Sequence, residues 1–212
     1  AIETVFPGAR YAPDSGIGYQ DARNAAIGVA GGYDGVTSTD GISSTYRGVN
    51  FELSTVRLSL REWNRDPETD MDRETEHEVF CGPWLLLRLG QSLPGTVRLY
   101  TRGTLEKAIR IGRKTGDAEF DKVFVTACES DEELARVLTA SLRARLLKVQ
   151  GCTGGCYITI LPEGLVHVAQ NTGRGLFDVT ADDSAQLQKA YTDALLQAKR
   201  IMDALQFSGL QE

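Results

Sequence analysis

Between residues 49 and 60 apolar side chains occupy alternate positions, and this period of two requires an extended strand with one buried face. The apolar residues are Val49, Phe51, Leu53, Val56, Leu58 and Leu60. Their parity slips by one after Leu53, and a β-bulge near Ser54 would produce the slip by inserting one residue. With the preceding Ser44–Tyr46, the segment predicts a β-hairpin that turns at Arg47–Gly48. A sheet is therefore the first constraint on the fold.

Further strands follow, for a total of about seven. A second hairpin is expected from Val79–Leu89 and Thr96–Tyr100, with its turn at Leu93–Gly95, and a fifth strand from Phe120–Ala127. The last two strands, Tyr157–Leu161 and Leu165–Gln170, are joined at Pro162–Gly164. Since the connections are short, a mostly antiparallel sheet is expected.

Helix signals stand in three places. A short helix is expected at Tyr19–Ile27, and Ser130 with Glu133 forms a capping box that begins a mid-chain helix. Thr139 is a second cap, so this helix is either continuous or broken there. The long C-terminal helix, Ala185–Phe207, carries one apolar stripe. Its members are Leu187, Ala190, Tyr191, Ala194, Leu195, Ala198, Ile201, Met202 and Leu205.

These elements predict one α+β domain over residues 1–212, because the length is close to that of a single domain and each sheet face needs a covering layer. The helices are expected on one face of the sheet. A curled sheet like that of pleckstrin-homology domains is the alternative. Residues 1–42 are expected to form a glycine-rich N-terminal extension. Its segment 28–32 lacks the Gly-Lys-Ser/Thr ending of a phosphate loop and is interpreted as a flexible turn.

Acidic residues are concentrated in one segment. The net charge is −6 and the sequence pI about 5.1, which disfavours nucleic acid as a partner. Residues 62–78 contain eight acids and two arginines, whereas the rest of the chain is formally balanced. This segment is predicted to be a solvated, mobile acidic loop. It lacks the spacing and turn glycine of an EF-hand, so no metal or cofactor is expected there, although weak cation attraction stays open.

The four cysteines, at positions 81, 128, 152 and 156, are too few for a disulfide framework and are typical of a reducing compartment. Cys152 and Cys156 flank a Thr-Gly-Gly turn, and two free thiols beside a glycine turn are the favoured interpretation. Zinc needs four ligands, and the two histidines, His77 and His167, are not paired with a second thiol pair. A redox pair or a local disulfide is also compatible with this spacing.

No catalytic residue is assigned. A Ser or Cys nucleophile needs an oriented base, and His77 lies in the acidic segment. His167 alternates with Val166 and Val168, so it is expected on a solvated strand face or at a sheet edge. The longest apolar run, Trp84–Leu87, is too short to span a membrane. The chain begins at Ala1 without Met or a signal segment, so it is expected to be a piece of a longer polypeptide.

Several strings carry a family resemblance. They are Val5–Gly8, Gly32–Asp34, Thr45–Phe51, Val79–Gly82, Glu119–Val125, Ser130–Glu132, Leu138–Leu142 and Leu146–Leu147. Together they resemble a bacterial family of uncharacterised proteins with a soluble domain of unknown function, often beside predicted membrane spans. The acidic segment and Cys152–Cys156 depart from that pattern. The resemblance implies a cytoplasmic-facing domain tethered to a membrane by segments outside this chain, with no established activity.

Three functional hypotheses follow. The first is a non-enzymatic interaction or sensory module of a membrane-linked bacterial protein, with a protein partner. The second is a domain that binds a small ligand or lipid in a pocket between sheet and helix. The third is an enzyme of unknown class that uses Cys152 or Cys156.

Overall fold

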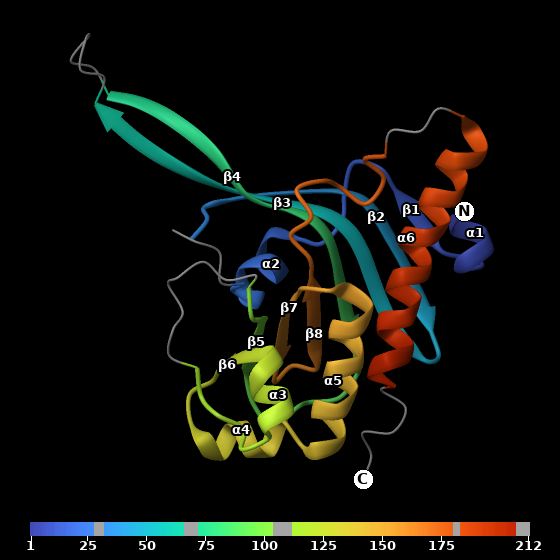
Figure 1. Cartoon of the computed structure of the whole chain (residues 1–212). Coiled ribbons are helices and arrows are strands. Elements are labelled where there is room, and N and C mark those ends of the chain that lie inside the picture. The colour runs from blue at the N-terminus through green and yellow to red at the C-terminus, as the bar shows by residue number, and fades with distance from the viewer. Residues whose placement is uncertain (28–31, 66–71, 104–111, 180–182, 207–212) are drawn as a thin grey trace.

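The computed structural model describes residues 1–27, 32–65, 72–103, 112–179 and 183–206 (Figure 1). Its eight strands form one open antiparallel sheet in the order β1-β2-β3-β4-β8-β7-β5-β6. The strands are β1 (Arg10–Ala12), β2 (Gly35–Tyr46), β3 (Val49–Arg65), β4 (Asp72–Arg88), β5 (Val97–Thr101), β6 (Phe124–Ala127), β7 (Tyr157–Leu161) and β8 (Leu165–Ala169). The helices are α1 (Ile2–Val5), α2 (Tyr19–Ala25), α3 (Ala118–Val123), α4 (Asp131–Val137), α5 (Ala140–Thr153) and α6 (Ser184–Leu205). The predicted α+β class is confirmed, and the curled-sheet alternative is wrong because β1 and β6 are separate ends of the sheet.

Both faces of the sheet carry a hydrophobic cluster. The larger cluster packs α1, α3, α4, α5 and α6 against one face, and α5 and α6 lie side by side there (Figure 1). The second cluster packs Ala22 and Ala25 of α2 against the other face, together with Trp84. The expectation that all helices share one face is therefore corrected for α2, whose small side chains allow close approach to the sheet.

Helix boundaries follow the predicted capping residues. The Ser130 side chain accepts a hydrogen bond from the Glu133 amide at 3.1 Å and begins α4, and Thr139 accepts from the Leu142 amide at 3.3 Å and begins α5. The mid-chain helix is thus broken at Thr139, the second of the two expected forms. Helix α6 confirms the long C-terminal helix, with buried residues from Leu195 to Leu205.

The β2–β3 hairpin turns at Arg47–Gly48, where both residues have positive φ, as a tight two-residue turn requires. The bulge predicted near Ser54 is wrong for β3. The extra residue lies opposite, in β2, between Thr39 and Ile42. The alternation of apolar residues in β3 shifts by one position for another reason: Leu53 packs in the cluster beneath α6, whereas Val56 packs in the cluster beneath α2 on the opposite face of the sheet. The buried face of β3 changes along its length.

The predicted second hairpin, Val79–Leu89 with Thr96–Tyr100, is also wrong. Strand β4 pairs with β8, and β5 pairs with β7 and β6, so the β7–β8 hairpin lies between them. Every residue of β7 is buried, and such a strand gains from neighbours on both sides. The predicted fifth strand is confirmed only for Phe124–Ala127, because Asp117 caps α3 immediately before it.

Residues 1–42 are not a separate extension. Strands β1 and β2 pair within the sheet, and Val5, Phe6, Ile17 and Ile27 are buried in the two clusters. The glycines accommodate turns and close approaches around these apolar anchors. Gly28–Gly31, interpreted as a flexible turn, lie outside the described residues.

The acidic loop is likewise corrected over its described part. Residues 62–65 and 72–78 continue β3 and β4, with register pairs from Ser59–Glu78 to Arg65–Asp72. This two-stranded ribbon projects beyond the sheet (Figure 1). Cross-strand pairing supplies the backbone hydrogen bonds that a loop of this composition would otherwise give to water. Residues 66–71 lie outside the described part.

None of the helices in the described ranges combines the length and the apolar character that a membrane crossing requires.

Candidate functional site

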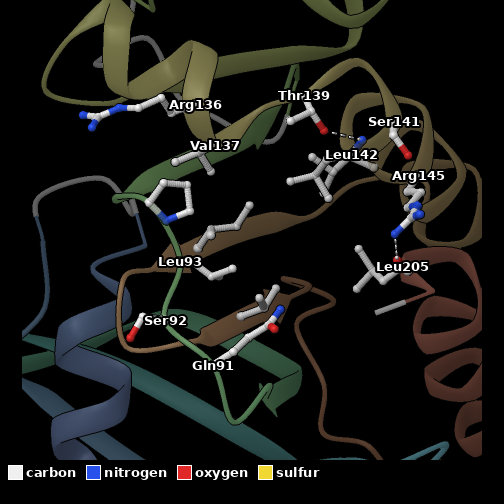
Figure 2. A pocket seen from close by; sticks show the side chains of 14 residues that line it. Gln91, Ser92, Leu93, Arg136, Val137, Thr139, Ser141, Leu142, Arg145 and Leu205 are labelled. Carbon is white, nitrogen blue, oxygen red and sulfur yellow. Dashed lines mark hydrogen bonds between the residues drawn. The ribbon is translucent and has the colours of Figure 1, made fainter. Parts of the chain in front are cut away.

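A cavity of about 520 Å³ lies where α4, α5 and the end of α6 meet one end of the sheet (Figure 2). It is lined by Gln91, Ser92, Leu93, Pro94, Arg136, Val137, Thr139, Ser141, Leu142, Arg145, Leu146, Ile160, Val166 and Leu205. Small-molecule sites in proteins commonly enclose about 300–1,000 Å³, so the cavity is of ligand size.

The inner side of the cavity is lined by apolar side chains. Ile160 of β7 and Val166 of β8 belong to the sheet, Leu142 and Leu146 come from α5, and Leu205 ends α6. All five side chains are buried in the cluster beneath the helices. They form the inner side of the cavity, where an apolar group of a ligand would meet apolar surface.

The connection between β4 and β5 closes a third side of the cavity. Leu93 donates its amide hydrogen to the Pro162 carbonyl at 2.9 Å, which ties this connection to the β7–β8 turn. Gly164 in that turn has a φ of +78°, and a Cβ there would collide with the Gln91 carbonyl oxygen. Glycine is required at this position for the connection to reach the cavity.

Polar residues surround the opening. Gln91, Ser92, Arg136, Thr139 and Ser141 are exposed. In Figure 2 the Arg136 guanidinium points away from the centre of the cavity.

Arg145 lies half-buried at the opening and faces Leu205 (Figure 2). Its Nη1 donates to the main-chain carbonyls of Gln206 at 2.9 Å and Leu205 at 3.4 Å. This guanidinium therefore connects the edge of the cavity to the last turn of α6.

The chemistry of the lining residues suits binding. The hydroxyls of Ser92, Thr139 and Ser141 have no imidazole, thiol or carboxylate beside them among the described lining residues. A hydroxyl nucleophile needs such a base. The cavity combines an apolar interior with hydrogen-bond donors at its edge, as ligand pockets do.

His167 does not lie on a solvated face or at a sheet edge, as expected from its strand pattern. It is fully buried in β8, between β4 and β7, and its Nδ1 accepts from Trp84 Nε1–H at 3.2 Å. The expectation failed because α2 covers the face that alternation alone assigned to water. His167 is not among the residues that line the cavity.

The other candidate residues are dispersed. His77 is exposed on the ribbon, with Nε2 3.7 Å from Glu62. Cys152 lies in the last turn of α5 and Cys156 precedes β7; both are free thiols, so no local disulfide links them. Burial raises the pKa of the Cys156 thiol and disfavours its reactive thiolate. No group of three metal-ligating side chains occurs among the described residues.

The sequence did not indicate the cavity. Leu142 and Leu146 share the spacing of ordinary core residues, and Leu93–Pro94 has the composition of a turn. Arg145 is the one local feature that could have pointed to a ligand site, because this cation lies between the buried positions Leu142 and Leu146 of α5. An arginine at such a position does not by itself indicate a ligand site, because long cationic side chains commonly lie across apolar surface.

Comparisons with known proteins add one structural likeness. No family model and no curated protein matches the chain. Among solved structures, the chain is similar to the crystal structure of the mycobacterial trehalose monomycolate transport factor A, TtfA, with 12% identity and a TM-score of 0.48. The likeness covers 97% of this chain and 92% of that chain.

Proposed function

We propose that this domain is a non-enzymatic module that binds a small, largely apolar molecule in the cavity between α5, α6 and the sheet. The observation that supports this proposal is the cavity itself, of about 520 Å³, with buried aliphatic side chains on its inner side and polar residues at its opening. Core packing normally leaves few voids larger than a water molecule, so a hollow of this size at a sheet–helix interface suits an occupant. The exposed residues at the opening give that occupant a route in.

The test uses the neutral fluorescent probe N-phenyl-1-naphthylamine, whose emission rises in apolar surroundings. Ser141→Trp places a large ring at the opening from an exposed helical position, whereas Ala144→Trp places the same ring on an exposed part of α5 that does not line the cavity. We expect saturable binding to the wild type and to Ala144→Trp, and at least about tenfold weaker binding to Ser141→Trp. Equal binding by all three proteins, or none by any, would contradict the proposal. Native mass spectrometry of the freshly purified chain would reveal a retained natural ligand.

A protein-interaction role is the second candidate, favoured by the ribbon of β3 and β4. Trp63 on this ribbon is 69% exposed, and exposed tryptophan is enriched at energetically important interface positions. The family resemblance adds the proposal that such a partner meets the domain on the cytoplasmic side of a membrane. A photo-crosslinking residue at position 63 should capture a discrete partner in the native cell, and one at exposed position 200 of α6 should not. The same products from both positions would contradict an interface on the ribbon.

A further inference from the structure

The charges around the cavity are of one sign. Among the described residues, its lining includes two arginines, Arg136 and Arg145, and no aspartate or glutamate. Neither arginine forms a salt bridge with a carboxylate in the described part of the chain. The opening of an otherwise apolar cavity is therefore positively charged.

Arg145 retains donors for a ligand. Within the described part of the chain, its hydrogen bonds are those of Nη1 to the carbonyls of Leu205 and Gln206, and these acceptors are neutral. A guanidinium carries five N–H donors, so Nη2 and Nε remain for an anion. Because the side chain is half-buried, its attraction for an anion is screened less than that of a surface arginine.

The opening is also close to the first turn of α5, where Thr139 and Ser141 present hydroxyl groups. Arg136 at the end of α4 is exposed, and its guanidinium points away from the centre of the cavity (Figure 2). The apolar walls continue inward from Leu142 to Ile160 and Val166. An anion at the opening and a hydrocarbon chain inside would each meet suitable surroundings.

We propose that the ligand is a single-chain amphiphile with an anionic head group, either carboxylate or phosphate. Arg145 binds the head group, and the chain lies against Leu146, Ile160 and Val166. This inference rests on the proposed binding function and assigns the chemical class of its ligand. Since Arg145 also holds the carbonyls at the end of α6, the bound head group tightens that helix end.

The experiment measures displacement of N-phenyl-1-naphthylamine by dodecanoate, dodecyl phosphate and neutral dodecanol, each below its critical micelle concentration. For the wild type, both anions should bind at least about tenfold more tightly than dodecanol, as expected for a charge-assisted hydrogen bond. The tighter of the two anions identifies the head group as carboxylate or phosphate. Inorganic phosphate and acetate should not displace the probe; displacement by either at the same concentration would show a free-anion site and overturn the amphiphile.

Variants at position 145 test whether Arg145 binds the anionic head group. Arg145→Gln should remove the preference for anions, so that dodecanoate and dodecanol bind with similar affinity to each other, and Arg145→Lys should keep part of the preference. The matched control is Lys148→Gln, which removes an exposed charge from the same helix outside the cavity. In the wild type, dodecanoate should slow amide hydrogen exchange at the end of α6 more than dodecanol does. A preference that persists in Arg145→Gln would overturn the assignment.

The outcomes separate the two proposals. If dodecanol displaces the probe as well as dodecanoate does, the binding function stands and the anionic head group is wrong. If the probe and all three amphiphiles fail to bind, the binding function is wrong as well. The wild-type comparison decides between these outcomes even if Arg145→Gln does not fold.

Discussion

The imidazole of His167 lies in the middle of the sheet, on the face that α2 covers, and has no exposed surface. Trp84 Nε1–H donates to its Nδ1, which assigns the proton of the neutral ring to Nε2. Burial lowers the pKa of His167 to about 4; the Asp21 carboxylate raises it and the Arg88 guanidinium lowers it, both more weakly. The residue is therefore a neutral core histidine at physiological pH.

This pKa makes stability depend on pH in a defined window. The folded-state pKa of about 4 lies below the reference value of 6.5, so between these values the unfolded chain binds more protons. Stability from this group is complete above pH 6.5 and lost as the pH falls towards 4, by about 3 kcal/mol in total. Urea unfolding at pH 7, 5.5 and 4 should show a smaller acid-induced loss for His167→Gln, whose amide oxygen still accepts from Trp84. Identical pH dependence in both proteins would contradict the buried neutral histidine.

Alanine substitutions at two glycines with similar φ can distinguish the cost of backbone strain from the cost of a steric collision. Gly90 has φ +68° with open space around it, whereas Gly164 has φ +78° and meets the Gln91 carbonyl. Gly90→Ala should reduce the free energy of unfolding by about 1 kcal/mol, the strain of a left-handed alanine. Gly164→Ala should reduce it by about 1–3 kcal/mol more and weaken probe binding, because the β4–β5 connection must move. Equal losses in denaturant titrations would show that the connection does not pack against this glycine.

At the scale of elements, the break between α4 and α5 shapes the cavity. Val137 on one helix and Leu142 on the next both reach it, as does Thr139 between them. A continuous helix would carry these side chains around one axis at 100° per residue, with no corner to enclose a hollow.

Thr139 is the residue that begins the second helix. Thr139→Ala removes the acceptor for the Leu142 amide and should lower the free energy of unfolding by about 1 kcal/mol. Thr139→Ser retains a hydroxyl and serves as the control, with stability close to that of the wild type. Chemical denaturation compares the three proteins. The same loss in both variants would indicate that the threonine methyl group, and not the cap, stabilises this corner.

In the whole molecule, the ribbon is separate from the hydrophobic core of the sheet–helix body. Among the residues of the ribbon whose side chains the structure describes, from 60 to 78, none belongs to either hydrophobic cluster, while Leu58 and Phe80 at its base do. The ribbon carries much of the acidic charge, and the opening of the cavity is cationic. A ligand site and a protein-docking site can therefore coexist on this chain.

Excision of the ribbon tests this separation. Joining Ser59 to Glu78, which are register partners, through Asn-Gly replaces residues 60–77 by a two-residue hairpin turn. The free energy of unfolding should change by less than about 1 kcal/mol, because no core contact is removed. Probe binding should be unchanged, and crosslinks from the ribbon should disappear with it. Loss of probe binding would show that ribbon and cavity are coupled.

Elements whose signals act over a few residues could be located from the amino-acid sequence. The caps at Ser130 and Thr139 and the turn at Arg47–Gly48 bond groups close in the chain, so composition and spacing were enough to locate them. Alternation located most strands, and the α+β class followed from their number and order. The acidic ribbon was misread because charge composition predicts solvation and carries no information about cross-strand pairing.

The order of strands, the burial of His167 and the cavity could be found only from the folded chain. Each depends on contacts between distant segments: Trp84 bonds His167 across 83 residues, and Arg145 bonds Gln206 across 61. Such contacts gain their free energy from shared burial and leave no local pattern. The sequence therefore specified a sheet with a covering helix, and the packing of α4, α5 and α6 on that sheet determined where a ligand-sized hollow remained.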